Sequence, residues 1–134
     1  MKAESSHTVS SQLFRTVPTE DFFHLFKKGV VDGHKVVNLL KYKKADVAAA
    51  ANVPLSSVRY EPHKMPSELK ERLTEWATAI NLVEGFFKDQ DKTLLWFTIS
   101  NPLLGEMSPR DMIRVGRFRK LLNFIQTALD ENRK

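Results

Sequence analysis

The sequence predicts an all-α fold, a compact multi-helix domain, on three observations. Apolar residues between positions 69 and 87 recur at steps of four and three residues, which is the spacing of one helix face. Residues that typically begin and end helices flank several shorter apolar segments. The single segment with strand-like composition, 92–100, has no second strand-like segment to pair with. We therefore expect an N-terminal helix-turn-helix-like half, a long connecting helix and a helical C-terminal module.

The N-terminal part is expected to begin with a tail and to continue with two short helices. Residues 1–12 are polar and rich in serine, so they bury little surface and are expected to be a disordered tail. Thr19 is a good N-cap for a first helix that ends at Gly29, because acids follow the threonine and lysines precede the glycine. Asp32 is the expected cap of a second helix, which continues to Leu40.

An alanine-rich segment follows, and it favours two further helices around a turn. Residues 43–52 have high helix propensity and small side chains, which allow another helix to approach closely. Asn52 tolerates a left-handed backbone, and Pro54 suits the first turn of a short helix over 55–60. Residues 13–66 together form the helix-turn-helix-like region.

Residues 67–88 are expected to form the central connecting helix, with Ser67 as its candidate cap. One such stripe in a small domain usually faces inward, so we interpret it as the core on which the other helices pack. A dimer seam is the alternative. The residues of the stripe are Leu69, Leu73, Trp76, Ile80, Val83 and Phe87.

The C-terminal module, residues 89–134, is expected to contain three helices. Asp89 is a candidate cap for the first, and we interpret 92–100 as part of that helix because a lone strand would lack a partner. Ser108 is the expected start of a short second helix. The last helix follows Gly116 and has an amphipathic pattern.

Composition narrows the possible functions. The chain has 134 residues, with 21 Lys+Arg against 16 Asp+Glu and a formal net charge of +5, which modestly favours an acidic partner. The absence of cysteine excludes a disulfide framework, a thiolate zinc site, an iron–sulfur cluster and a cysteine nucleophile. No apolar stretch approaches the ~20 residues that cross a bilayer, and the start lacks the apolar core of a secretion signal. We expect a cytoplasmic protein with no membrane partner.

Enzyme signatures are missing from the sequence. There is no glycine-rich phosphate loop, no nucleophile elbow and no metalloprotease motif. The histidines at positions 7, 24, 34 and 63 lack metal-ligand spacing, and the acids at 89 and 91 are simply explained as helix-capping groups. Neither catalysis nor a metal nor a cofactor is expected.

The segment around the alanine run has the pattern of a helix-turn-helix. Val47 and Ala48 occupy the positions where two helices cross, Asn52 occupies the turn, and Val53 and Val58 anchor the second helix. The alternative is an ordinary helical hairpin with an alanine-rich interface, since a nearby proline limits the length of the second helix. The residues that would contact DNA phosphates or base edges are Lys43, Lys44, Ser56, Ser57, Arg59 and Lys64.

Basic residues also cluster where the last helix begins, with only Asp111 opposing them. Arginine suits bidentate contact with a carboxylate or a phosphate. The simpler interpretation is a solvated charged face. The cluster consists of Arg110, Arg114, Arg117, Arg119 and Lys120.

Several C-terminal features occur in a recognisable order. They are Trp96, the turn Asn101-Pro102-Leu103-Leu104-Gly105, the helix start Ser108-Pro109-Arg110-Asp111, Gly116 and the amphipathic last helix. In order and spacing this segment resembles the toxin-binding module of Xre/MbcA/ParS-type antitoxins, and the upstream helix-turn-helix-like half is similar to the other part of such proteins. Glu106 stands where that family usually has a second glycine, and Asn52 replaces its usual turn glycine.

The resemblance implies a bacterial antitoxin that binds and blocks a cognate toxin, commonly a RES-domain enzyme that consumes NAD. It also implies a homodimer that binds operator DNA and represses its own operon. The alternative is a stand-alone helix-turn-helix transcriptional regulator whose C-terminal module only dimerises. The expected toxin-binding residues are Asn101, Pro102, Leu103, Leu104, Gly105, Arg117, Arg119 and Lys120.

Overall fold

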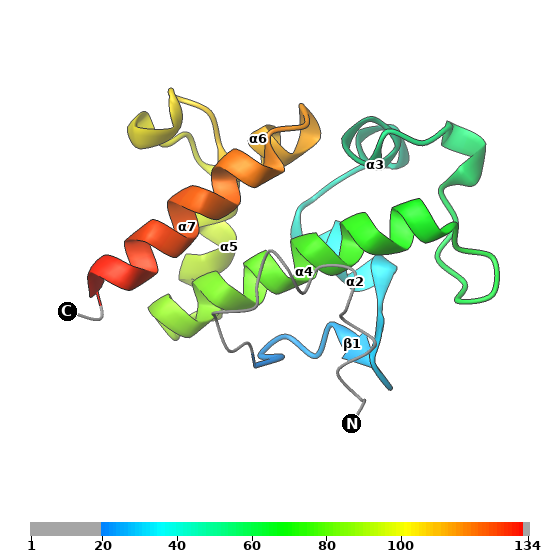
Figure 1. The fold of residues 1–134 in the computed structure, drawn as a ribbon, viewed down its shortest axis with the longest axis horizontal. Coiled ribbons are helices and arrows are strands. Elements are labelled where there is room, and N and C mark those ends of the chain that lie inside the picture. Colours follow the sequence, from blue (N-terminus) through cyan, green and yellow to red (C-terminus); the bar gives the residue numbers. More distant parts are fainter. Residues whose placement is uncertain (1–19, 133–134) are drawn as a thin grey trace.

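A long central helix, α4 (Ser67–Phe87), organises the computed structural model, which describes residues 20–132 (Figure 1). Within those residues there are six α-helices and one two-stranded hairpin, so the expected helical fold class is confirmed. Helices α2, α3, α5 and α7 all contact α4, as does the second strand of the hairpin. A single apolar cluster extends from Leu25 to Ile125 through all these elements.

The apolar stripe of α4 lies inside the molecule, as the spacing predicts. Five of its six residues are buried, and Phe87 at the end of the helix is half-buried against the same core. Trp76 is 1% exposed and meets the ring of Tyr42 edge-on, with centroids 5.8 Å apart. The stripe is therefore occupied by the chain's own helices and is not available as a dimer seam. Ser67 is the first helical residue, while Pro66 occupies the cap position without a capping side chain.

The helix predicted from Thr19 to Gly29 is wrong over its described part. Residues 20–25 are non-helical, and a short antiparallel hairpin follows, with β1 (Phe26–Lys27) paired to β2 (Val30–Val31). The two turn residues, Lys28 and Gly29, have φ values of 52° and 81°. Two consecutive positive φ angles make a tight two-residue hairpin turn, whereas the pattern of lysine followed by glycine predicted a helix end. Thr19 and the predicted tail, residues 1–12, lie outside the described residues.

The carboxylate of Asp21 holds this N-terminal segment onto α4. Its oxygens accept hydrogen bonds from the backbone N–H groups of Leu25 (2.8 Å) and Phe26 (3.0 Å). The same carboxylate accepts from the side-chain amide of Asn81, whose oxygen in turn accepts from the N–H of Phe23. Asn81 is 1% exposed, so these bonds satisfy a buried polar group in the middle of α4.

The next two helices follow their sequence signals. Helix α2 (Gly33–Leu39) begins at Asp32, whose side chain accepts from the N–H of Lys35. Helix α3 (Lys44–Ala51) ends at Asn52, which adopts the expected left-handed conformation with φ 59°. The short helix expected over 55–60 is reduced to η2 (Leu55–Ser57), a single 3₁₀ turn.

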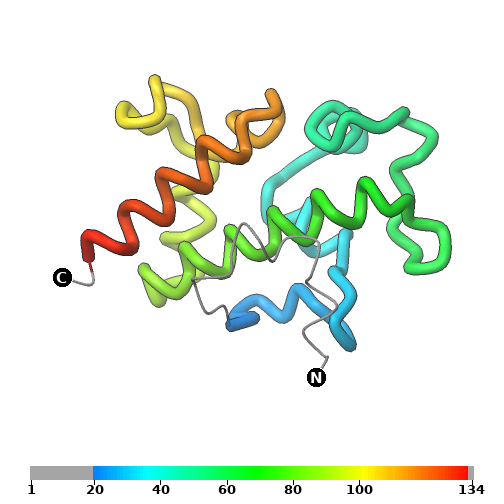
Figure 2. Tube along the Cα trace, in the orientation of Figure 1, coloured from blue at the N-terminus to red at the C-terminus, as the bar shows by residue number. Residues whose placement is uncertain are grey.

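Two of the C-terminal helices begin at the capping residues that the sequence predicts. Helix α5 (Gln90–Thr98) begins at Asp89, and α6 (Pro109–Arg114) begins at Ser108. Between them lies η3 (Pro102–Leu104), and α7 (Phe118–Asn132) completes the chain. Figure 2 shows the trace leaving α5, turning through the η3 loop and returning as α7 across α4. No helix among residues 20–132 has the length and apolarity that crossing a membrane requires.

Replacing Trp76 with alanine tests the central position of α4. Because this side chain is 1% exposed, we expect Trp76→Ala to lower the free energy of unfolding by about 3–5 kcal/mol. Urea denaturation followed by circular dichroism measures the change. The matched control is Leu103→Ala at a side chain 77% exposed, for which a change within about 0.5 kcal/mol is expected. A loss under about 1 kcal/mol for Trp76→Ala would contradict the assignment of this residue to the core.

Candidate protein-binding site

The loop between α5 and α6 is a closed, well-bonded turn. The side-chain oxygen of Asn101 accepts from the N–H of Leu103 at 2.9 Å and so caps η3. The backbone of Asn101 exchanges hydrogen bonds around the loop, donating to Met107 and accepting from Leu104 and Glu106. Gly105 ends the 3₁₀ turn with φ 71°. These bonds fix a turn on which Leu103 is 77% exposed.

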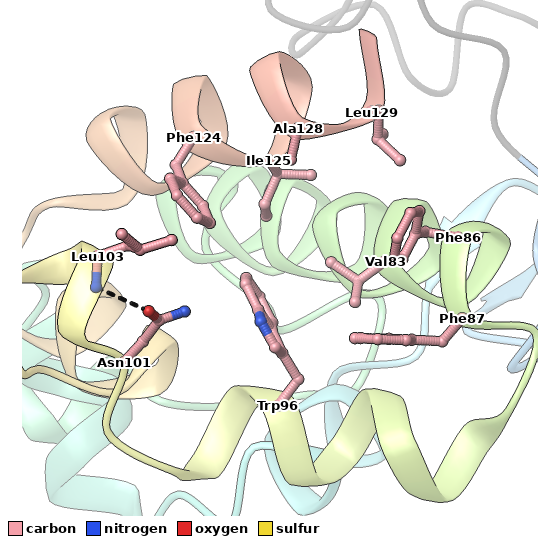
Figure 3. A pocket seen from close by; sticks show the side chains of 10 residues that line it. All are labelled: Val83, Phe86, Phe87, Trp96, Asn101, Leu103, Phe124, Ile125, Ala128 and Leu129. Atoms are coloured by element: carbon pink, nitrogen blue, oxygen red, sulfur yellow. Dashed lines mark hydrogen bonds between the residues drawn. The ribbon is translucent and has the colours of Figure 1, made fainter. Parts of the chain in front are cut away.

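Beside this turn lies a depression of about 210 Å³, which we call the apolar groove. Figure 3 shows Trp96 of α5 and Phe124 of α7 facing each other across it, with Leu103 at one end and Phe86 and Leu129 at the other. The rings of Trp96 and Phe124 are nearly parallel, with centroids 6.4 Å apart. The groove residues are Val83, Phe86, Phe87, Trp96, Asn101, Leu103, Phe124, Ile125, Ala128 and Leu129.

The structure brings some of the predicted toxin-binding residues together and separates others. Asn101 and Leu103 line the apolar groove, Pro102 and Gly105 are exposed on the turn, and Leu104 packs against the core. The basic residues lie at the start of α7 and are exposed. Arg117 reaches back toward the turn, with Nη1 3.8 Å from the sulfur of Met107. Arg119 lines a different cavity, and Lys120 lines neither.

Two arginines of the basic cluster have structural roles. Arg110 donates to the backbone carbonyls of Leu40 (2.6 Å) and Lys41 (2.9 Å), and its guanidinium lies 5.2 Å from the centre of the Tyr42 ring. The Tyr42 hydroxyl donates to the carbonyl of Arg110. Burial raises the pKa of Tyr42 well above its ordinary value, against the opposing charge of Arg110. Arg114 pairs with Asp111 at 3.2 Å. Hence only the basic residues beyond Gly116 remain for a partner.

The predicted DNA-contacting residues are accessible, but they do not lie on a recognition helix. Lys43, Lys44, Ser56, Arg59 and Lys64 are exposed, and Ser57 is half-buried. The segment after η2 is extended from Val58, and the Arg59 guanidinium donates to the carbonyl of Ser56 at 3.4 Å. A helix-turn-helix protein inserts a helix of several residues into the major groove, and a single 3₁₀ turn is shorter than that.

The aromatic residues of the groove are the functional candidates that the sequence analysis missed. Phe86 and Phe124 were absent from the predicted site, although Phe86 is 46% exposed. For Phe86, the sequence signal that could have indicated a binding site was a large aromatic residue next to the end of a helix, α4. Three histidines fall within residues 20–132, and that part of the chain contains no group of three or more His, Asp or Glu side chains able to hold a metal ion.

A scan of protein-family models and searches of curated proteins and solved structures find no match to this chain. The geometry of the site and the resemblance of its motif to an antitoxin module are therefore the grounds for a functional proposal.

The turn also contains a strained residue whose replacement is testable. Glu106 has φ 69°, a left-handed conformation that costs an L-residue about 1–2 kcal/mol, and it stands where the resembled family has glycine. Because glycine loses more chain entropy on folding, we expect Glu106→Gly to raise the free energy of unfolding by a net amount below about 1 kcal/mol.

The control for this prediction is Glu106→Ala, which removes the charge but keeps the left-handed strain. Urea denaturation of both variants measures the difference. If alanine and glycine raised the free energy of unfolding equally, the charge of Glu106, and not its backbone conformation, would be what destabilises the turn.

Proposed function

We propose that this chain is an antitoxin that binds a cognate toxin protein through the apolar groove and blocks it without chemistry. One observation carries the proposal: the capped turn holds Leu103, 77% exposed, at the open end of a groove lined by aromatic side chains. Leu103 shares the lining of this groove with Phe86, which is 46% exposed, and contiguous exposed apolar surface of this kind marks protein-interaction sites.

The chemistry of the groove fits a protein ligand. Phe86, Trp96 and Phe124 present rigid aromatic surface at a low cost in side-chain entropy, and aromatic residues dominate the binding energy of protein interfaces. Polar side chains at the edge of such an interface determine the orientation of the partner more than the binding affinity. Arg117, next to the turn, is placed to meet an acidic side chain of the partner.

The identity of the toxin comes from the resemblance of the turn and last helix to Xre/MbcA/ParS-type modules, whose usual partner is a RES-domain enzyme that consumes NAD. Such a partner is inhibited when a protein surface covers the entrance to its active site, because the dinucleotide is then excluded. No group transfer on the antitoxin is needed, in keeping with the lack of enzyme motifs in the sequence.

Operator binding and homodimerisation are further parts of the proposal. A dimer would use a surface other than the stripe of α4, which is buried within the chain. The alternative function, a stand-alone helix-turn-helix regulator, has less support, because η2 is only a 3₁₀ turn.

The test of toxin binding is a charge placed at Leu103. The partner to be tested is any RES-domain enzyme encoded beside the gene for this chain, and calorimetry measures its affinity. We expect Leu103→Asp to weaken binding about 30-fold or more, the effect of losing an interface hot spot. The matched control is Leu95→Asp, a change at an equally apolar side chain that is 57% exposed on α5 and outside the groove.

Retained affinity in Leu103→Asp, or an equal loss in Leu95→Asp, would contradict the groove as the toxin-binding site. Growth of cells that express the toxin provides a second readout, because the wild-type chain and Leu95→Asp should both restore growth and Leu103→Asp should not.

DNA binding has a separate test on the chain's own promoter fragment. If the exposed basic residues contact phosphates, affinity should fall steeply with salt concentration, and Arg59→Ala should weaken it at every salt concentration. Lys92→Ala, an exposed lysine on α5, is the control and should bind normally. A salt-independent interaction, or none, would remove operator binding from the proposed function.

A further inference from the structure

A second depression, of about 280 Å³, lies where three parts of the chain meet, and we call it the junction cavity. It lies among the end of α3, the first half of α4 and the connection from α6 to α7. It is separate from the apolar groove, because the two share no lining residue. Its residues are Ala50, Ala51, Asn52, Arg72, Glu75, Trp76, Ile113, Gly116, Phe118 and Arg119.

The polar side chains of the junction cavity offer hydrogen-bond donors in excess of acceptors. Glu75, 8% exposed, accepts from Nε and Nη2 of Arg72 at 2.9 and 3.1 Å, which engages both of its carboxylate oxygens. Arg72 also contacts the half-exposed carboxylate of Glu71 through Nη2 at 3.2 Å, which leaves Nη1 uncommitted. Within residues 20–132, neither the Arg119 guanidinium nor the Asn52 side-chain amide has a hydrogen-bond or ion-pair partner.

The buried Glu75 carboxylate interacts strongly with the guanidinium groups around it. Burial raises the pKa of Glu75 above its ordinary value, while the charge of Arg72 and its hydrogen bonds oppose that rise. Arg119 also favours the ionised form of Glu75 through its charge. Two guanidinium groups therefore surround one buried carboxylate. Arg72 is also paired with Glu71, whereas Arg119 has no carboxylate at ion-pair distance among residues 20–132.

The rest of the lining is apolar. Trp76 and Ile113 are almost fully buried, Phe118 is half-buried, and the side chains of Ala50 and Ala51 add methyl groups. The cavity volume is slightly below the range of about 300–1,000 Å³ that drug-sized ligands occupy. A ligand that fits has a short aliphatic stem and a small anionic head with two acceptor atoms.

We propose that the junction cavity binds a glutamate side chain of a partner protein, with its carboxylate on Arg72 and Arg119 and its methylene groups on Trp76, Ile113 and Phe118. The identification of this partner as the toxin rests on the proposed function. The preference of the cavity for a carboxylate is independent of it. A nucleic-acid phosphate fits less well, since it has no aliphatic stem for the apolar wall.

The experiment is an NMR titration of the ¹⁵N-labelled full chain with a blocked glutamate, N-acetyl-glutamate N-methylamide. The chain has two tryptophans, and each indole N–H reports on one site: Trp76 on the junction cavity and Trp96 on the apolar groove. We expect saturable shifts of the Trp76 indole in the millimolar range, an unmoved Trp96 indole, and no response to the blocked glutamine analogue.

Substitution of the cavity arginine tests the contact directly. Arg119→Gln is expected to raise the dissociation constant of the blocked glutamate about tenfold, which is the effect of losing a charge-assisted hydrogen bond. Lys70→Gln is the control, because Lys70 is an exposed cation in the first half of α4 that lines neither depression. It should leave the dissociation constant unchanged.

Four results would overturn the proposal. Three of them are an unresponsive Trp76 indole, an equal response to the glutamine analogue, and a wild-type affinity in Arg119→Gln. Tighter binding of inorganic phosphate than of blocked glutamate would also overturn it, and would assign the cavity to a phosphate group instead. Failure of the Leu103 test would refute toxin binding through the groove, and the titration result would stand.

Discussion

The contact between Tyr42 and Arg110 joins the N-terminal half of the chain to α6, the helix that leads into α7. Arg110 donates to two carbonyls at the end of α2, while Tyr42 donates back to the carbonyl of Arg110. The bonds satisfy carbonyl groups that a helix end leaves free, and the ring of Tyr42 packs on Trp76 of the central helix. This reciprocal arrangement holds the start of α6 against the segment that follows α2, beside the packing of α6 on α3, and so helps to fix where α7 begins.

The two candidate sites follow from that placement of α7. Its first turn contributes Phe118 and Arg119 to the junction cavity, and its middle contributes Phe124 and Ile125 to the apolar groove. One helix therefore borders an apolar site and a charged site at different points along its length. Apolar burial supplies most of the affinity of an interface and charged groups supply its orientation, so the two sites have complementary roles for one partner.

Local signals in the sequence were sufficient for most helices and insufficient for the hairpin. Asp32, Asp89 and Ser108 begin helices as predicted, because a capping side chain bonds to backbone only three residues away. Lys28 and Gly29 are compatible with both a helix end and a hairpin turn. The segment before the hairpin is held by Asp21, which bonds to the nearby Leu25 and Phe26 and also to Asn81, 60 residues along the chain. The contact with Asn81 is one that no local pattern contains.

The candidate sites were harder to predict than the fold for the same physical reason. The turn at Asn101 was found because its proline, glycine and capping asparagine are adjacent in sequence. Arg110 looked like part of a binding cluster, and only acceptors 69 and 70 residues away reveal it as structural. The junction cavity needs Arg72 and Arg119 from helices that meet only in the folded chain. Sequence spacing thus specifies how a segment begins and ends, whereas tertiary packing determines which side chains remain available to a partner.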